Sequence, residues 1–399
     1  MSDSSRKELR VLVVDDSAVV RQSISTILSR EPGITVQTAS DPLIAEQKMA
    51  SFVPDVMILD LEMPRMDGLT FLRKLMAERP LPVVVCSSYA EDGSEMALRA
   101  LELGAVDLLP KPRLGVRDFL HDSAVALVES VRGAAMARVG ARVAPASSRR
   151  ASLEEARGKE PVRPPKSEAF SPSAILPRQT ADVVLPPAPA PLQVGEIWPL
   201  IAIGASTGGT EALRFLLDAM PADAPPILIV QHMPVAFTAA FAERLAKTSH
   251  VMVREAAHGE VVRRGKALIA RGDQHLVLRR QANRCHVDLV DGPLVSRHRP
   301  SVDVLFRSVA QAVGACAVGL IMTGMGDDGA QGLLEMREAG AATFAQDESS
   351  SVVFGMPREA IVRGAVSAVL PLAELPIALV RAATAQAAAV ETSQRRREP

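Results

Sequence analysis

Ser206 is the residue whose surroundings in the sequence best fit nucleophilic chemistry. It lies in Gly204-Ala-Ser-Thr-Gly-Gly209, between an apolar run of strand length, Leu200 to Ile203, and a segment with apolar residues at helical spacing, Thr210 to Leu217. Glycines at such a turn adopt backbone angles that side chains forbid, and the helix start offers N–H groups to developing negative charge. The letters match the G-x-S-x-G elbow of serine hydrolases, although a glycine-rich turn can instead bind phosphate or be only a tight turn.

Two further predicted strands end on residues that could activate this serine. Pro226 to Val230 is followed by Gln231 and His232, and Ala315 to Met322 is followed by Thr323-Gly-Met-Gly-Asp-Asp-Gly329. Parallel strands bring their carboxyl ends to one edge of a sheet, so a serine, a histidine and an aspartate could meet there. Histidine accepts a proton near neutral pH, and a carboxylate holds the imidazole in the right tautomer and stabilises its charged form.

Two of these assignments have competitors in the sequence. His298 precedes a predicted helix, Val302 to Val313, for which Ser301 is the expected N-cap, and it could line the same cleft. His232 is favoured over His298 because it follows a strand as Ser206 does. Asp327 competes with Asp328, and spacing does not choose between them. Four other histidines fall on predicted hairpins or loops and are expected at the surface: His250, His258, His275 and His286.

A second set of chemistry-bearing residues lies in the first part of the chain. Four predicted strands there end on polar or charged side chains, and helical patterns separate them, which indicates alternating βα units around a parallel sheet. Clustered carboxylates are costly without a cation, and Mg²⁺ prefers such hard oxygen ligands and bridges to phosphate. The pattern therefore predicts phosphoryl transfer to a carboxylate, with solvated acids at strand ends as the alternative. The side chains are Asp15, Asp16, Asp60, Ser87 and Lys111.

The bulk composition restricts the class of protein. A chain of 399 residues is too long for one ordinary core, so two or more domains are expected. Its 45 basic and 46 acidic residues and its 3% aromatic content argue against recruitment to nucleic acid or to anionic lipid. Three cysteines without paired spacing predict neither a disulfide framework nor a zinc site. No apolar run reaches membrane-spanning length and no signal peptide precedes the first predicted strand, so a cytoplasmic protein is expected.

The sequence divides into two predicted folded parts and a linker. Ten of the 29 prolines fall between Pro145 and Pro191, mixed with Ala, Ser and Arg, a composition typical of a semi-stiff spacer that buries little surface. Beyond about Thr384 no clear apolar face remains, and a frayed tail is expected. The predicted divisions are residues 1–135 for the first domain, 136–196 for a flexible linker, 197–385 for the second domain and 386–399 for a polar tail.

The first domain resembles the receiver domain of two-component response regulators. The resemblance rests on Asp15-Asp16, Asp60-Leu-Glu-Met-Pro-Arg-Met-Asp-Gly68, Ser87 and Lys111-Pro112. It implies a flavodoxin-like (βα)5 fold in which Asp60 is the phosphoacceptor and binds Mg²⁺ together with Asp15 and Asp16. Ser87 would be the switch hydroxyl and Lys111 the phosphate-side lysine. Leu108 occupies a position where many receivers carry a switch aromatic, so signalling through an aromatic rotamer is not expected here.

The second domain resembles the catalytic domain of the CheB family of chemotaxis methylesterases. The matching stretches are Gly204-Ala-Ser-Thr-Gly-Gly209, Gln231-His-Met-Pro234, Arg299-Pro-Ser-Val-Asp-Val-Leu-Phe306 and Thr323-Gly-Met-Gly-Asp-Asp-Gly329. The family resemblance implies a doubly wound, mostly parallel sheet with a β-hairpin insertion and assigns Ser206, His232 and Asp328 as the catalytic residues. Asp327 stands where relatives often carry Asn, so an extra charge beside His232 is expected.

The same resemblance implies a reaction and partners. The substrates would be methyl-glutamate esters of methyl-accepting chemotaxis proteins, with methanol released and receptor glutamines also deamidated, and the chemotaxis histidine kinase CheA would donate the phosphoryl group. Backbone N–H groups near Thr207 and Met325 would bind the oxyanion, and the esterase would use no cofactor. Arg297 and Arg299 would guide acidic receptor helices. Such a protein would contact membrane receptor arrays only peripherally.

Two other classes of function compete with an enzyme. The second domain could be a non-enzymatic output module that binds a nucleotide or a protein, but it lacks G-x-G-x-x-G and a Walker lysine. It could instead be a DNA-binding regulator, but no compact basic helix-turn-helix is present.

Overall fold

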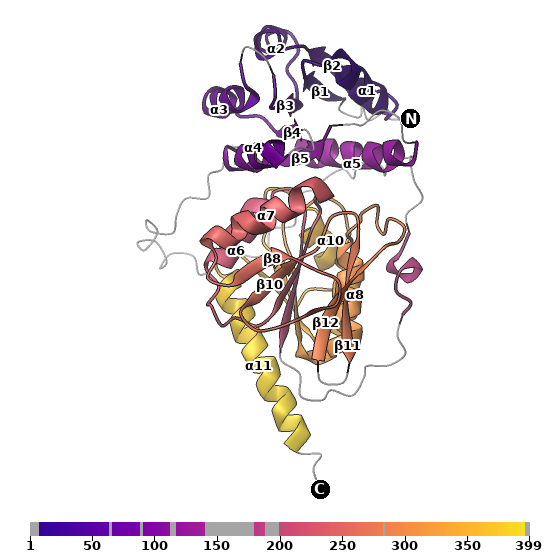
Figure 1. Ribbon diagram of the computed structural model, residues 1–399, viewed down its shortest axis with the longest axis vertical. Coiled ribbons are helices and arrows are strands. Elements are labelled where there is room, and N and C mark those ends of the chain that lie inside the picture. The colour runs from indigo at the N-terminus through magenta and orange to yellow at the C-terminus, as the bar shows by residue number, and fades with distance from the viewer. Residues whose placement is uncertain are drawn as a thin grey trace, which may run out of the picture.

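The N-terminal domain is a five-stranded parallel sheet with helices on both faces (Figure 1). The computed structural model describes residues 8–63, 66–87, 91–111, 117–139, 179–187, 199–281 and 284–395. The strand order β2-β1-β3-β4-β5 and the parallel pairing confirm the predicted receiver fold. Its strands are β1 (Leu9–Val14), β2 (Ile34–Ala39), β3 (Val56–Asp60), β4 (Val83–Ser87) and β5 (Asp107–Pro110). Its helices are α1 (Ala18–Leu28), α2 (Pro42–Met49), α3 (Gly68–Glu78), α4 (Glu91–Glu102) and α5 (Arg117–Ala135).

The C-terminal domain contains a seven-stranded sheet in the order β15-β14-β13-β6-β7-β10-β8, with every pairing parallel. The strands are β6 (Leu200–Ala205), β7 (Ile227–Gln231), β8 (Met252–Glu255), β10 (Lys266–Ile269), β13 (Ala317–Ile321), β14 (Ala342–Gln346) and β15 (Ala368–Leu370). The central strands are apolar except for Gln231 at the end of β7, as expected for a sheet buried on both faces. The covering helices are α6 (Gly209–Asp218), α7 (Val235–Thr248), α8 (Val302–Val313), α9 (Ala330–Glu338), α10 (Met356–Val362) and α11 (Leu375–Arg395).

The predicted hairpin insertion is present as a separate small sheet. β11 (His275–Gln281) and β12 (Arg284–Val290) pair antiparallel, and β9 (Glu260–Val261) pairs with the other edge of β12. The hairpin lies against α8, whose Ser308 hydroxyl accepts from the Leu278 N–H at 2.9 Å. Ser301 is the N-cap of α8, as the sequence predicted, with its hydroxyl accepting from the Val304 N–H.

Two sequence expectations for the chain outside the domains need correction. The predicted flexible linker includes a fixed segment, residues 179–187, with a short 3-10 helix at Ala181–Val183. This segment is held on α8 by Arg307, whose guanidinium donates to Asp182 at 2.5 Å and to the Leu185 carbonyl at 3.0 Å. The tail expected to fray beyond Thr384 is instead helical as far as Arg395, because Leu375, Leu379 and Ala383 bury one face of α11. Most of the remaining linker lies outside the described residues.

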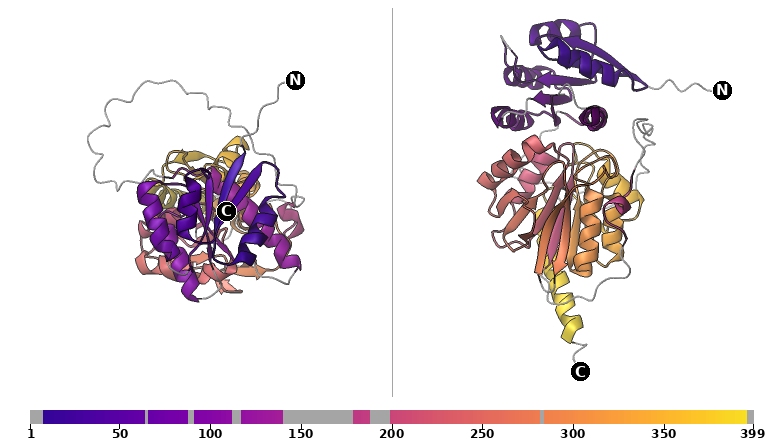
Figure 2. Two further views of the ribbon diagram at one scale, coloured as in Figure 1. Left: turned by 90° about the horizontal axis from the view of Figure 1, so that it is seen from above. Right: turned by 45° about the vertical axis from the view of Figure 1, so that its right-hand side comes forward.

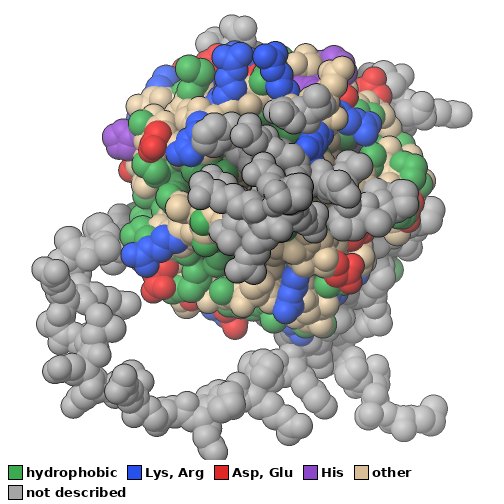
Figure 3. All heavy atoms as spheres, turned by 90° about the horizontal axis from the view of Figure 1, so that it is seen from below, with side chains coloured by type: hydrophobic (Ala, Val, Ile, Leu, Met, Phe, Trp, Pro, Cys, Tyr) green, Lys and Arg blue, Asp and Glu red, His purple; other side chains and the backbone are tan. Residues whose placement is uncertain are grey.

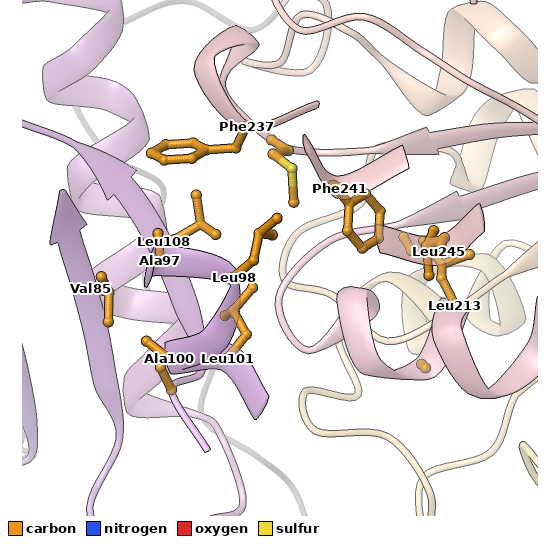
Figure 4. Packing of buried hydrophobic residues seen from close by; sticks show 14 of the residues in the cluster. Val85, Ala97, Leu98, Ala100, Leu101, Leu108, Leu213, Phe237, Phe241 and Leu245 are labelled. Atoms are coloured by element: carbon orange, nitrogen blue, oxygen red, sulfur yellow. The ribbon is translucent and has the colours of Figure 1, made fainter. Parts of the chain in front are cut away.

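The two domains are docked through the face of the N-terminal domain that α4, β5 and α5 form (Figure 1), and Figure 2 shows the same docking from two further sides. Leu98 of α4 and Leu108 of β5 belong to the same buried cluster as Phe237 and Phe241 of α7 (Figure 4). Polar contacts flank this cluster: Arg244 of α7 donates to the Leu98 carbonyl at 2.5 Å and pairs with Glu102 at 2.5 Å. Leu108, at the position where many receivers carry a switch aromatic, therefore packs in the interface between the two domains.

A second contact joins the end of α5 to the loop after β14. The Arg138 N–H donates to the Val352 carbonyl at 3.1 Å, and the Arg138 guanidinium pairs with Glu348 at 2.5 Å.

On the end of the molecule that faces away from the receiver sheet, basic and acidic side chains are interspersed with hydrophobic ones (Figure 3). Among the described residues, no helix is both long and apolar enough to cross a membrane.

Candidate active site

Strand register brings Ser206 and His232 side by side. In the parallel pair β6 and β7, the last residues, Ala205 and Gln231, lie opposite each other. Ser206 and His232 directly follow these two residues, so they leave the sheet side by side. The His232 N–H donates to the Ala205 carbonyl at 3.1 Å, and the Gln231 side chain donates to the Ser206 carbonyl at 3.0 Å. Strands in a sheet lie about 4.8 Å apart, so these two side chains start from adjacent backbone positions.

The turn after Ser206 shows why the sequence needs a glycine there. Gly208 has φ +76, and a Cβ at this position would lie 2.5 Å from Cβ of Val352. Gly208 is also the residue before the first turn of α6, and its N–H donates across the domain boundary to the Val106 carbonyl at 3.3 Å. Any side chain at residue 208 would therefore disturb both the turn and the contact with Val106, the residue before β5.

Asp328 lies in the loop between β13 and α9 and receives four hydrogen bonds. His232 Nε2 is 2.8 Å from its Oδ2, and the Ser301 hydroxyl donates to its Oδ1 at 2.7 Å. The backbone N–H groups of Val302 and Asp303, in the first turn of α8, donate at 2.7 Å and 3.0 Å. Although burial alone would raise the pKa of Asp328, the hydrogen bond and charge of His232 lower it to about 2. A carboxylate at a helix N-terminus is further stabilised by the helix dipole.

The contact with Asp328 determines the tautomer of His232. An ionised carboxylate only accepts hydrogen bonds, so Nε2 of His232 carries the proton and Nδ1 holds the lone pair. Nδ1 is buried and has no hydrogen-bond partner among the described residues. His232 therefore presents an unused base at the strand edge where Ser206 lies. Such contacts are often loose in the free enzyme and tighten when substrate binds.

The geometry separates the residues that competed in the sequence. The ring of His298 stacks on that of His232, with centroids 3.7 Å apart and planes 8° apart, and its Nδ1 is bonded to the Ser296 carbonyl at 2.9 Å. Burial, followed by the nearby charge of His232, lowers the pKa of His298 to about 3. Asp327 turns away and forms an ion pair with Arg363 at 2.9 Å. The pair that shares a hydrogen bond is thus His232 and Asp328.

The candidate site opens into a cavity of about 420 Å³ that both domains line. Ser206, Thr207 and Met325 contribute from the C-terminal domain. Helix α5 covers them closely, because a Cβ on Gly133 would lie 3.1 Å from the Thr207 hydroxyl and 3.3 Å from Cβ of Met325. The receiver side of the cavity is lined by polar side chains as well as apolar ones, among them Asp107, Glu129 and Ser130.

The two arginines that the sequence assigned to substrate guidance are both engaged in ion pairs. Arg297 donates to Glu129 of α5 at 2.7 Å, so the receiver domain binds it directly. Arg299 pairs with Asp273 and donates to the Gly292 carbonyl at 2.6 Å. In this docked arrangement, Arg297 becomes available to another acidic group only if α5 moves away.

Asp107 is a site feature that the sequence did not reveal. Its carboxylate accepts from the Ser130 hydroxyl at 2.8 Å and from the Leu108 N–H at 2.9 Å. Burial raises the pKa of Asp107 to about 6, with Ser130 and Thr207 among the hydrogen-bond donors and His232 among the charges that oppose the rise. A carboxylate of the receiver thus lies within electrostatic reach of the candidate base, and only the docked arrangement of the two domains creates this proximity.

His275 corrects a sequence expectation. It was expected at the surface because it opens a hairpin, but it is fully buried. Its Nε2 is bonded to the Pro293 carbonyl at 2.9 Å, and its Nδ1 accepts from the Ser301 N–H at 3.2 Å. The first side chain of β11 points inward under the loop that precedes α8. His275 therefore supports the backbone of Ser301, which in turn binds Asp328.

The receiver domain gathers its acidic residues at the carboxyl edge of its own sheet. Oxygens of Asp15, Asp16 and Asp60 lie within 4.8 Å of one another. Lys111 Nζ is 2.7 Å from Asp60 and 3.7 Å from Asp15. Burial and then the charge of Asp60 raise the pKa of Asp15 to about 6, and burial also raises that of Asp60. These crowded hard oxygen donors fit a divalent cation such as Mg²⁺. Ser87 is buried at the end of the adjacent strand, β4.

A second group of potential metal ligands, His232, His298 and Asp328, has unsuitable geometry. Its ligand atoms also lie within 4.8 Å of one another. However, the two imidazole rings are stacked nearly parallel, so their in-plane lone pairs cannot converge on one ion at the usual distance of about 2 Å. Asp328 already accepts four hydrogen bonds. This arrangement is suited to proton transfer.

Comparison with known proteins matches both halves of the chain. Family models of the CheB methylesterase and of the response regulator receiver domain match residues 201–379 and 11–118. A protein-glutamate methylesterase/protein-glutamine glutaminase of Anaeromyxobacter dehalogenans is 54% identical over 379 residues, covering 95% of this chain and 98% of that protein. One of Geobacter metallireducens is 52% identical over 369 residues, covering 92% and 96%. The crystal structure of the Thermotoga maritima CheB methylesterase catalytic domain is 37% identical, with a TM-score of 0.45, and covers 46% of this chain and 98% of that one.

Proposed function

Since this chain belongs to the CheB family of methylesterases that carry a response regulator receiver domain, we propose that it is a phosphorylation-activated hydrolase of chemoreceptors. Its substrates are methyl esters of glutamate side chains on methyl-accepting chemotaxis proteins, and it also deamidates receptor glutamines. The names of relatives about half identical over almost their full length support this activity. The observation that carries the proposal is the buried His232–Asp328 pair, whose free nitrogen lies at the same sheet edge as Ser206.

The geometry supports a reaction in two stages. Ser206 Oγ attacks the side-chain carbonyl carbon while His232 Nδ1 takes its proton, and Asp328 stabilises the imidazolium that forms. Backbone N–H groups of Thr207 and Met325 receive the oxyanion. The bond to the methoxy group then breaks, and His232 gives the proton to the departing methanol. Water attacks the acyl-enzyme in the same way and releases glutamate and free Ser206. With a glutamine side chain, the first product is ammonia.

Control of the activity rests on the docked receiver domain. The Gly208 N–H donates to the Val106 carbonyl of the receiver domain, and Gly133 of α5 lies close to Thr207, the residue after Ser206. Glu129 of α5 also binds Arg297, which otherwise would guide acidic receptor helices. We propose that phosphorylation of Asp60 weakens this docking through Ser87 and Lys111. A tenfold activation requires only about 1.4 kcal/mol of differential docking free energy. Interfaces between domains of one chain are usually modest in area, and a docking equilibrium of this kind can shift by that amount.

The acidic cluster of the receiver is the proposed site of phosphoryl transfer. Asp15, Asp16 and Asp60 would hold Mg²⁺, which when bound offsets the negative charge of the incoming phosphoryl group. Lys111 keeps its ammonium beside the Asp60 oxygen that would carry the phosphate. The phosphodonor in the cell would be the chemotaxis histidine kinase CheA, and the protein would act in the cytoplasm, at receptor arrays, without nucleic acid.

The proposed function is tested by release of radiolabelled methanol from methylated receptor membranes. The full chain should release methanol, and a small-molecule phosphodonor with Mg²⁺ should increase the rate by roughly tenfold or more. In Asp60→Asn, basal release should persist and the stimulation should disappear, because the amide cannot accept the phosphoryl group. Removal of Mg²⁺ should abolish the stimulation in the native chain as well. Absence of methanol release with and without phosphodonor would contradict the proposal.

The docking contact makes a second prediction, for Arg244. Arg244→Ala removes hydrogen bonds to the Leu98 carbonyl and Glu102 of α4. A loss of about 1 kcal/mol of docking free energy should raise methanol release by the unphosphorylated chain roughly fivefold and leave the phosphorylated rate unchanged. Arg254→Ala is the matched control, because Arg254 pairs with Glu260 inside the same domain. An equal increase in both variants, or in neither, would count against control by docking.

A further inference from the structure

The loop between β12 and α8 contains a tight turn with an unusual backbone conformation. Val295 and His298 exchange two backbone hydrogen bonds, at 3.0 Å and 2.8 Å, so Ser296 and Arg297 are the two central residues. Their φ angles are 48° and 70°. Positive φ at both positions is the type I′ pattern, which asparagine and glycine normally occupy. A serine and an arginine hold this conformation only where the surrounding structure compensates for the strain, and such strain often accompanies a functional constraint.

The surrounding structure holds this turn from three sides. The Ser296 N–H donates to the Gln179 carbonyl at 2.9 Å, in the fixed segment before β6. The Ser296 hydroxyl donates to Asp303 of α8 at 3.2 Å. Val295 is fully buried in a small cluster with Ala181 of the same fixed segment. These contacts hold the turn in place and with it His298, the last residue of the turn.

The turn presents the imidazole of His298 flat against that of His232. The ring centroids are 3.7 Å apart and the planes differ by 8°. The Ser296 carbonyl can only accept a hydrogen bond, so Nδ1 of His298 carries a proton and fixes this ring in its own plane. Burial, followed by the charge of His232, lowers the pKa of His298 to about 3, which keeps the ring neutral near pH 7.

His232 needs such a contact because its hydrogen bonds do not fix its plane. One nitrogen is bonded to Asp328, whereas Nδ1 has no partner among the described residues. A ring tethered at a single nitrogen can pivot about that hydrogen bond, which would move Nδ1 relative to the sheet edge at which Ser206 lies. A flat neighbour at van der Waals distance removes this freedom. Misplacing a reacting group by about 1 Å can reduce a rate by roughly 10²-fold.

We propose that His298 is a positioning residue for the catalytic base, a neutral ring whose face clamps the plane of His232 so that Nδ1 stays directed at Ser206. The proposal rests on the proposed function of Ser206 and His232. When His232 takes the proton, the charged groups that face it are Asp328 and, from the receiver, Asp107.

The kinetic test compares two replacements of His298 in the full-length, phosphorylated chain. His298→Ala removes the stacked ring, and kcat for methanol release should fall about 10- to 100-fold while KM changes less than about twofold. His298→Phe keeps a flat ring and should retain kcat within about threefold of the native value. His250→Ala, on the surface, is the matched control and should be unchanged. If His298→Phe is as slow as His298→Ala, the residue transfers protons or acts through its hydrogen bond, and the clamp is excluded.

An NMR measurement tests the clamp independently of methyl-ester hydrolysis. In histidine-labelled protein, the His232 ring C–H signals should lie upfield because of the ring current of His298. They should move downfield and broaden in His298→Ala but stay upfield and sharp in His298→Phe. Thermal unfolding of both variants distinguishes loss of the clamp from loss of the fold. Native-like His232 signals in a folded His298→Ala would overturn the proposal, even if the chain proves to hydrolyse another ester.

Discussion

Replacing Ser206 by alanine should lower the rate of methanol release from methylated receptors by about 10⁴- to 10⁶-fold. The size of the effect follows from the loss of the nucleophile, since neither His232 nor water at this position can form the acyl-enzyme. The remaining rate would reflect binding and oxyanion contacts alone. The measurement is release of labelled methanol under saturating phosphodonor, so that the receiver domain does not limit the rate.

The control for this prediction lies within the same molecule. Ser206→Ala leaves Asp15, Asp16, Asp60 and Lys111 unchanged, so it should still take up a phosphoryl group on Asp60 at the native rate. The variant should also unfold at nearly the native temperature, because the Ser206 backbone N–H, which donates to the Thr323 carbonyl at 3.0 Å, is kept. Residual methanol release within tenfold of the native rate, with intact phosphorylation, would remove Ser206 from the mechanism.

Strand ends were predictable from the sequence because one local pattern determines them. The apolar runs before Ser206, Gln231-His232 and Asp60 have strand length, so the polar residues that follow each run had to lie at a sheet edge. The cap at Ser301 was predictable for the same reason, since its hydroxyl serves the helix directly after it. Parallel topology then placed Ser206 and His232 on one edge, and strand pairing brings these two ends into adjacent register.

The contacts between the domains could not be predicted, because they depend on surfaces far apart in the sequence. The apolar residues of α7, including Phe237 and Phe241, recur at a spacing that indicates a helix, but nothing in the sequence specifies that α4 of the receiver packs on them. The same applies to Asp107, which is unremarkable at the start of a strand until docking brings it to the cavity.

Local patterns also failed where tertiary structure overrides them. His275 opens a hairpin strand, a position that favours exposure, yet it is buried because the loop before α8 folds over it. Ser296 and Arg297 carry no signal for a left-handed turn, since that conformation is imposed by Gln179 and Asp303. The final helix continues past Thr384 because alanine is a strong helix former and because Leu375, Leu379 and Ala383 pack the preceding turns against the domain.

Replacing Asp328 by asparagine should lower the rate of methanol release by about 10³- to 10⁴-fold and also destabilise the C-terminal domain. The amide offers one acceptor oxygen where the carboxylate accepts four hydrogen bonds, and its NH₂ faces donors. It would favour the wrong tautomer of His232 and could not stabilise the imidazolium. The first turn of α8 would lose the carboxylate that binds the N–H groups of Val302 and Asp303.

The pH dependence of stability gives this prediction a second measurement. The pKa of Asp328 is lowered from 3.8 to about 2 in the folded protein, so its stabilising contribution is present above about pH 4 and is lost as the pH falls toward 2. Thermal unfolding of Asp328→Asn should lack this contribution at every pH. Its melting temperature should therefore differ most from that of the native chain above pH 4, with the two converging as the pH falls toward 2.

Asp327 provides the matched control, since the same substitution one residue earlier changes the charge by the same amount. Asp327 forms a partly exposed ion pair with Arg363, whereas His232 is bonded to Asp328. Asp327→Asn should keep methanol release within about threefold of the native rate, because partly exposed ion pairs contribute little and the hydrogen bond between His232 and Asp328 is kept. If the two variants lose activity equally, net charge in this loop controls His232, and the specific pairing of Asp328 with the imidazole does not.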